Sequence, residues 1–185
     1  MSMPGTYKEA EPTTTRLRMN DPRYAEVWEW LIEEAELLDG RQFEAWLARI
    51  AADVSYRMPV RQTVDVEDDE ESPATFHYLD ENYESLWVRV QRLIGGAAQS
   101  ESPPSRTRRH VSNVRVATGA RDDEFKASSY LLVLRSRRDT PNYQTISCER
   151  HDRLRRVEDD RLVLVSREIL VDQSSLGVSN LSIFL

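Results

Sequence analysis

The second half of this 185-residue chain contains four successive long segments that constrain the fold more than any other feature. They are rich in β-branched, aromatic and Arg residues, and turn-forming residues separate them. The segments cover residues 107–118, 124–137, 143–157 and 161–172. This pattern predicts four β-strands. Because only short turns join them, we expect an antiparallel, strongly curved sheet.

The first half of the chain has helical periodicity instead. Asp21 and Pro22 form a typical helix start, and Gly40 is a typical helix end. Between them, apolar residues recur at spacings of three and four: Tyr24, Val27, Trp28, Leu31, Ala35 and Leu38. The other side of this helix carries an acidic stripe of Glu26, Glu29, Glu33 and Glu36. The stripe is interpreted as a solvated face, with a docking face for a basic partner as the alternative.

Two further helices and one more strand are expected before residue 100. A capping box of Asp39 and Gln42 precedes a short amphipathic helix with Phe43, Trp46, Leu47 and Ile50. Residues 54–60 predict a strand that Pro59 confines to a sheet edge or a strand end. A third helix is expected from Asp80 to the glycine pair that begins at Gly95. The order of elements predicts an α+β domain with helices packed on one face of the sheet.

Two stretches are expected to lie outside the packed domain. Residues 1–20 have few apolar anchors and are interpreted as a mobile N-terminal arm, which leaves 21–185 as a single domain. Residues 63–75 hold six acids and are interpreted as a solvated loop. A calcium site is disfavoured there because the central Gly of a calcium loop is missing.

Composition excludes several classes of protein. The net charge of −7 and the isoelectric point near 5.1 argue against a nucleic-acid partner. The chain has neither an apolar run long enough to span a membrane nor a secretory signal, and its lone Cys148 cannot form an intrachain disulfide. We therefore expect a soluble, cytoplasmic protein. Of its 25 basic residues all but Lys8 and Lys126 are Arg, which suits interfaces, although a base-composition bias would give the same count.

The sequence lacks the ligand sets of the common redox centres. A Rieske cluster needs two Cys and two His, and a mononuclear iron triad needs two His and a carboxylate. The three histidines, His77, His110 and His151, lie far apart in different predicted elements. We therefore expect no cofactor and no metal in this chain.

A curved sheet wrapped around helices can still form a cone with an apolar pocket. Folds of the nuclear-transport-factor-2 type use such pockets for isomerases and dehydratases. The candidate catalytic residues are Tyr56, His110 and Asp172, because strand parity places His110 with Val114 and Asp172 with Leu170. A buried Asp with a raised pKa would serve as a general base. In the alternative interpretation, His110 hydrogen-bonds a neighbour and Asp172 caps the end of its strand.

Several motifs resemble those of one family. They are Glu34–Asp39 with Trp46-Leu47, Tyr56–Val60, Pro103–Arg108 leading to Val111–Val114, Asp152–Arg156, Leu170–Gln173 and the final Asn180–Leu185. Together they resemble the small (beta) subunit of aromatic ring-hydroxylating dioxygenases of the biphenyl, naphthalene and phenylpropionate type. The resemblance covers about residues 24–185. It departs from the family at Ala98 or Gln99, where a Trp is usual, and at Cys148, where a Gly is usual.

The resemblance implies a cone-like α+β fold of the nuclear-transport-factor-2/cystatin-like type and a non-catalytic, structural role. It implies that the Rieske [2Fe-2S] cluster and the mononuclear Fe(II) lie in a larger alpha subunit. The two subunits would form an α3β3 assembly that converts aromatic rings to cis-dihydrodiols, and a ferredoxin and a reductase would act through the alpha subunit. A stand-alone isomerase or dehydratase, or a small-ligand-binding protein of the same fold, is the alternative.

Contacts between chains are expected from two Arg-rich segments and from the apolar tail. Arg side chains form charge-assisted pairs with carboxylates across interfaces. Large apolar residues at the end of a chain need a surface to cover them. The expected interface residues are Arg106, Arg108, Arg150, Asp152, Arg155, Asn180 and Phe184. A tail that only plugs its own cone is the alternative for the last of these.

Overall fold

The computed structural model describes residues 14–60, 76–98, 101–137, 140–173 and 180–185. The predicted acidic loop at 63–75 and most of the predicted N-terminal arm, residues 1–13, lie outside these ranges. No helix in the described ranges is both long and apolar enough to cross a membrane.

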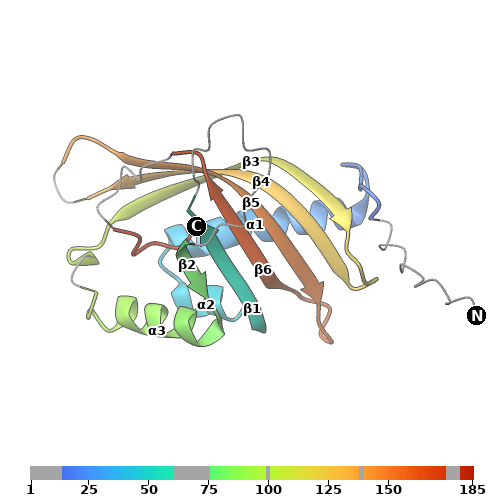
Figure 1. Cartoon of the computed structure of the whole chain (residues 1–185), viewed down its shortest axis with the longest axis horizontal. Helices are drawn as coiled ribbons and strands as arrows, with labels where there is room; N and C mark the ends of the chain where they lie inside the picture. Colours follow the sequence, from blue (N-terminus) through green and yellow to red (C-terminus); the bar gives the residue numbers. More distant parts are fainter. Residues whose placement is uncertain (1–13, 61–75, 99–100, 138–139, 174–179) are drawn as a thin grey trace, which may run out of the picture.

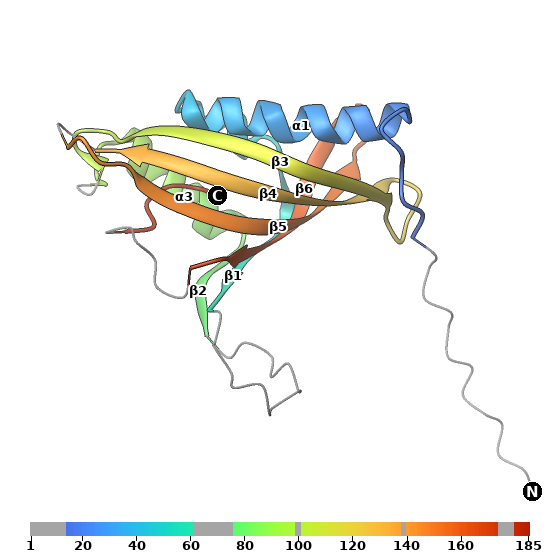
Figure 2. The same ribbon diagram turned by 90° about the horizontal axis from the view of Figure 1, so that it is seen from above.

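Six strands form one curved sheet (Figures 1 and 2) in the order β2-β1-β6-β5-β4-β3. The strands are β1 (Ile50–Pro59), β2 (His77–Glu81), β3 (Arg106–Thr118), β4 (Glu124–Ser136), β5 (Gln144–Arg156) and β6 (Leu162–Val171). The four predicted long strands are confirmed as β3 to β6, and they pair antiparallel as expected. The β1–β6 pair is parallel, in contrast to the fully antiparallel sheet expected from the sequence.

Three helices accompany the sheet: α1 (Pro22–Asp39), α2 (Phe43–Leu47) and α3 (Tyr83–Ile94). The long helix α1 runs along one side of β3, β4 and β5 (Figure 2). The sheet face toward α1 is called the inner face below, and the opposite face is called the outer face. The hydrophobic core lies on the inner face, in agreement with the predicted α+β arrangement.

The start of α1 is confirmed, but its buried face is rotated from the predicted one. The Asp21 carboxylate accepts a hydrogen bond from the Arg23 N–H at 3.0 Å, as a helix cap does. Trp30 is buried, and its indole N–H donates to the Leu162 carbonyl at 2.9 Å. Trp28 is 43% exposed, so its assignment to the core was wrong.

Two other helix boundaries are corrected by the structure. Gln42 makes no side-chain cap, and the Asp39 carboxylate accepts instead from the Thr107 hydroxyl and the Arg109 N–H, both at 2.8 Å. The third helix begins after Asn82, whose side chain accepts from the Ser85 N–H in a capping box. The predicted start, Asp80, belongs to β2, a short and largely exposed strand without apolar alternation.

Irregular residues in β3 and β6 change which side chains face inward. In β3 the register shifts between Ser112 and Arg115, and Asn113 has a φ of 52°. In β6 the pairing skips Val165, because Leu154 pairs with Leu164 and Arg153 with Ser166. Each extra residue is a β-bulge, and it reverses the alternation of side chains beyond it.

Part of the predicted mobile arm is bound to the edge of the sheet. The Leu17 N–H donates to the Val116 carbonyl and the Thr118 N–H donates to the Thr15 carbonyl, both at 2.9 Å. Leu17 is buried in the core. The boundary predicted at residue 20 therefore lies too late in the chain, because this segment covers the open edge of β3.

Candidate functional site

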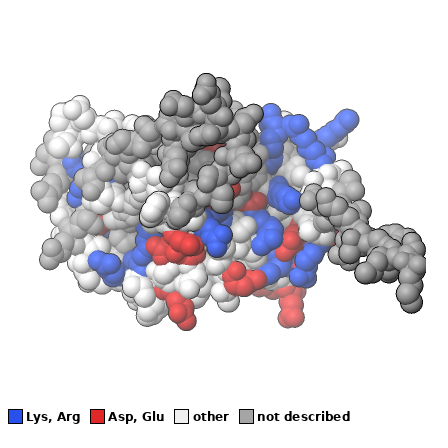
Figure 3. Space-filling model, in the orientation of Figure 1, with Lys and Arg blue, Asp and Glu red and all other residues white. Residues whose placement is uncertain are grey.

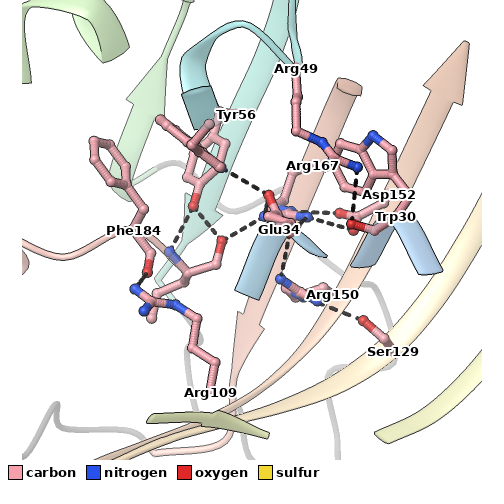
Figure 4. Close-up of polar contacts among 12 residues, drawn as sticks. Trp30, Glu34, Arg49, Tyr56, Arg109, Ser129, Arg150, Asp152, Arg167 and Phe184 are labelled. Atoms are coloured by element: carbon pink, nitrogen blue, oxygen red, sulfur yellow. Dashed lines mark hydrogen bonds and ion pairs between the residues drawn. The ribbon is translucent and has the colours of Figure 1, made fainter. Parts of the chain in front are cut away.

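A network of buried charges occupies the inner face of the sheet (Figure 4). Glu34 of α1 forms ion pairs with Arg150 of β5 at 3.2 Å and with Arg167 of β6 at 2.7 Å. The Trp46 indole N–H donates to the same carboxylate at 3.1 Å. All three charged side chains are almost completely inaccessible to solvent. The network therefore ties α1 to two strands through charge-assisted hydrogen bonds.

Arg167 also binds a second buried carboxylate. Its Nε and Nη2 groups donate to the two oxygens of Asp152 at 2.7 and 2.8 Å. Asp152 and Arg167 are direct neighbours across the β5–β6 pair, so the sheet register sets this bidentate geometry. Burial alone would lower the pKa of Arg167, but Asp152 and Glu34 raise it well above its usual value. Arg167 is therefore a permanent cation between two acids.

The ion pairs that raise the pKa of Arg167 lower the pKa of Glu34. Burial alone would raise the pKa of Glu34, but the guanidinium groups of Arg167 and Arg150 outweigh it and hold this pKa below the ordinary 4.5. A carboxyl group whose pKa is lower in the folded state stabilises the fold above the unfolded-state pKa. That stabilisation is lost as the pH falls through the folded-state pKa.

The first prediction concerns this pH dependence. We expect the free energy of unfolding of the wild type to decrease as the pH falls below 4.5, the ordinary pKa of Glu34. In Glu34→Gln the decrease over the same pH range should be shallower, because the variant has no proton to take up at this position. Denaturant titrations at a series of pH values measure both slopes. Equal slopes would show that Glu34 does not titrate as stated.

The tail at residues 180–185 lies against the inner face and is held by its main-chain oxygens. Four Arg side chains from four different elements donate to these oxygens. The contacts are Arg135 to Asn180 at 3.1 Å, Arg89 to Leu181 at 2.7 Å, Arg109 to Phe184 at 2.6 Å and Arg167 to Leu185 at 2.8 Å. Contacts to main-chain atoms fix the path of the tail, while its side chains fill the core.

The side chains at the end of the tail complete the core. Ile183, Phe184 and Leu185 are buried, and the Phe184 ring stacks on Trp46 with centroids 4.2 Å apart. Within the described residues 180–185, the expectation that the large apolar residues at the end of the chain are covered is confirmed. The expected interface role of Phe184 is corrected, because its ring packs inside its own chain, as in the alternative interpretation.

A second buried ion pair fixes the start of the tail. Arg135 of β4 is fully buried and pairs with Glu101, whose carboxylate also accepts from the hydroxyl of Ser182 at 2.6 Å. Burial alone would raise the pKa of Glu101, but the hydrogen bonds from Ser182 and Ser105 and the charge of Arg135 keep it below its ordinary value. Asn180 takes part through its side-chain oxygen, which accepts from the Ser182 N–H at 3.3 Å.

The three candidate catalytic residues do not come together. The buried Tyr56 hydroxyl donates to the Leu185 oxygen at 2.6 Å and accepts from the Leu185 N–H at 3.0 Å, so the tail occupies it. His110 is exposed on the outer face, because the bulge at Asn113 reverses the parity used to place it. Asp172 is exposed just beyond β6, where its N–H donates to the Ser147 carbonyl at 3.0 Å. Its position matches the alternative in which it caps its strand.

The expected interface residues fall into two groups. Arg150 and Asp152 are corrected, because their charges are paired inside the chain and are inaccessible to another subunit. Arg106 and Arg108 are exposed on β3, and Arg155 pairs with Asp53 at the surface. Interface roles for these three and for the half-buried Asn180 stay predictions.

The described residues contain no cluster of three or more His, Cys, Asp or Glu side chains that could hold a metal ion. Cys148 is buried, and burial raises the pKa of its thiol to about 11. A thiol with this pKa is protonated at neutral pH, and thiolate is the form that binds metals.

The pairing of the buried charges is only weakly indicated by the sequence. One signal was available: Glu34 follows Leu31 by three positions and precedes Leu38 by four, so it shares the apolar side of α1. Acids and Arg residues at inward positions of strands gave a weaker signal, because the bulges obscure which positions face inward. No local pattern identified Arg135 and Glu101 as partners, since they are far apart in the chain.

The curved sheet, its helices and its enclosed tail define a small cone-like α+β domain, and comparison with known proteins identifies its class. The family model described as "Ring hydroxylating beta subunit" matches residues 33–177. The chain therefore belongs to the ring-hydroxylating beta subunit family, whose members are components of aromatic-ring dioxygenases.

Individual relatives agree with this assignment. The chain is 37% identical to the chlorobenzene dioxygenase subunit beta of Cupriavidus sp. (strain PS12), over 86% of this chain and 87% of the relative. It is 32% identical to the biphenyl 2,3-dioxygenase subunit beta of Rhodococcus jostii (strain RHA1), over 95% and 98%. A structure of naphthalene 1,2-dioxygenase with bound indole matches with a TM-score of 0.82 and 25% identity, over 92% of this chain and 90% of that chain.

Proposed function

We propose that this chain is a non-catalytic, structural subunit that holds the large subunits of an aromatic ring-hydroxylating dioxygenase in an α3β3 assembly. The assembly would add both oxygen atoms of O2 to an aromatic ring and form a cis-dihydrodiol. As a subunit of this kind the chain would form the trimer of the assembly in the cytoplasm, and it would contact neither nucleic acid nor membrane.

The observation that carries this proposal is the occupied interior of the cone. The place where an enzyme of this fold would bind a substrate holds the charge network and the tail. Tyr56 is the one candidate catalytic residue that points inward. Its hydroxyl is hydrogen-bonded to the main chain of Leu185. An interior of this kind stabilises the subunit, and the surfaces are left for binding partners.

The iron centres of the reaction would belong to the large subunit. This chain has one Cys and three His, and the exposed His77, His110 and His151 lie on three different strands. These residues do not fit a Rieske cluster, which needs two Cys and two His. A ferredoxin and a reductase would deliver electrons to the large subunit without using residues of this chain.

The proposed contacts with other chains involve Arg106, Arg108, Arg155 and Asn180. Arg106 and Arg108 project from the exposed side of the edge strand β3. Planar guanidinium groups at such positions can form bidentate pairs with carboxylates of a neighbouring subunit.

The second prediction tests the proposed function directly. Purified alone, this chain should be colourless and should contain no stoichiometric iron, measured by absorption spectroscopy and metal analysis. Co-expressed with the large subunit of an aromatic ring-hydroxylating dioxygenase from the same organism, the chain should co-purify in equal amounts with that subunit. The complex should have the mass of a hexamer by light scattering, and its iron should stay with the large subunit. Stoichiometric iron in the isolated chain, or failure to bind the large subunit, would contradict the proposal.

A further inference from the structure

The outer face of the sheet carries a hollow with an unusual concentration of positive charge. Its volume is about 540 Å³. The basic residues that line it are Arg16, Arg115, Lys126, His151 and Arg153. They come from the segment beside β3 and from three neighbouring strands. Figure 3 shows Lys and Arg side chains gathered toward the end of the molecule where the described chain begins. We call this region the basic hollow.

Four of the five basic residues of the basic hollow have no carboxylate partner among the described residues, whereas His151 lies 3.4 Å from Glu149. Lys126 and Arg153 are direct partners across the β4–β5 pair, and like charges in this position destabilise a sheet. Within the described ranges, neither they nor Arg16 and Arg115 lie within 4 Å of a carboxylate, although the whole chain has a net charge of −7. Among the described residues, this like-charge pair therefore has no carboxylate within 4 Å, and an acidic surface of another chain can supply one.

The surface next to the basic hollow indicates a protein as the source of that counter-charge. Tyr130 and Leu132 lie farther along the outer side of β4 and are 49% and 38% exposed. Protein interfaces combine exposed aromatic and aliphatic side chains with a charged rim, and Tyr and Arg are enriched in them. A free anion would use the cations but would leave these apolar side chains uncovered.

A second copy of this chain is the less suitable partner. Many of its described surface acids are already paired with its own Arg residues, including Glu26 with Arg156, Glu33 with Arg49, Asp53 with Arg155 and Asp80 with Arg57. Its net charge of −7 also opposes the approach of another copy at long range. A different chain with free carboxylates fits the basic hollow better.

We propose that the basic hollow is the docking site for a carboxylate-bearing surface of the dioxygenase large subunit, with Tyr130 and Leu132 as the adjoining apolar contact. This inference rests on the proposed function and adds the surface and the charge of the partner to it. The repulsion between the cross-strand neighbours Lys126 and Arg153 then destabilises the isolated subunit, and carboxylates of the large subunit offset it in the complex.

A competition experiment tests this inference. The large subunit is co-expressed with two differently tagged copies of this chain, one wild type and one variant, and mass spectrometry measures the ratio of the two in the purified complex. Arg153→Glu and Lys126→Glu are the variants. Arg92→Glu is the control, because it makes the same charge change as Arg153→Glu at an exposed position of α3 outside the hollow.

We expect each hollow variant to be under-represented in the complex by about tenfold, because attraction becomes repulsion at a charged interface. The control should be incorporated within about twofold of the wild type, as expected for a charge outside the contact. The defect should shrink when assembly is measured at about 500 mM salt, which screens the charges. The isolated variants should melt at the wild-type temperature or above it, because a Glu opposite the remaining cation forms a favourable cross-strand pair.

The possible failures are distinguishable. If neither the wild type nor the variants enter the complex, the proposed function itself fails, and this inference fails with it. If all chains enter equally, the proposed function stands and the docking site is wrong. If the variants change the mass of the isolated small subunit in light scattering, the hollow binds a second copy, which overturns the choice of the large subunit. Nucleic acid that co-purifies with the wild type and is lost from the variants would overturn it as well.

Discussion

Replacing Arg167 by alanine should lower the free energy of unfolding by about 3–5 kcal/mol, the usual cost of removing one partner from a buried ion pair. Arg167 is fully buried and neutralises both Glu34 and Asp152. Its loss leaves two buried carboxylates with Arg150 as the nearest remaining cation of the network. Denaturant unfolding followed by circular dichroism gives the change in stability, which is a large part of the total for a domain of this size.

The matched control is Arg161→Ala. Arg161 pairs with Asp159, but the two side chains are 61% and 53% exposed. An exposed ion pair contributes about 0–1 kcal/mol. A loss at Arg167 as small as that at Arg161 would mean that the network does not stabilise the fold in the way its geometry indicates.

Removing the aromatic ring of the tail should have an effect of similar size. Phe184→Ala should destabilise the isolated chain by about 3–5 kcal/mol. The buried ring contacts both Trp46 and Phe43, and its removal leaves a cavity. Deleting residues 181–185 should destabilise it further. The deletion also leaves the guanidinium groups of Arg109 and Arg167 without the main-chain oxygens that they bind.

Phe76→Ala provides the control for this prediction, because Phe76 is 68% exposed and its truncation should change stability by less than about 0.5 kcal/mol. Thermal melting of the isolated chain measures all three variants. A truncated chain that keeps wild-type stability but fails to bind the large subunit would show that the tail acts at an interface.

The parts of the fold that depend on local periodicity could be predicted from the sequence. The Asp21-Pro22 start of α1 and the four long strands follow from spacing and turn residues alone, and the structure confirms them. The short strand β2 could not be predicted in this way, because most of its residues are exposed and it has no apolar alternation. Its existence depends on pairing with β1, a contact between distant residues.

The candidate site was harder to predict because single bulge residues determine which side chains of a strand face inward. The bulge at Asn113 places His110 on the outer face, and no sequence pattern indicates this bulge. The buried charged residues were difficult to predict for another reason, because charged side chains are usually exposed. Arg150 and Asp152 look like surface residues by type, and only the positions of Glu34 and Arg167 explain why they are inside.

The contacts of the tail also determine the order in which the domain can be completed. Tyr56 and Leu185 are 129 positions apart in the chain, and the Arg residues that bind the tail come from elements spread between α3 and β6. The tail can dock only after these elements have assembled, and contacts of such long range slow folding. Until then, these guanidinium groups have their carboxylate partners but lack the main-chain oxygens of the tail. We therefore expect the core to close late in folding, and an assembly partner that recognises only the closed subunit would select completely folded chains.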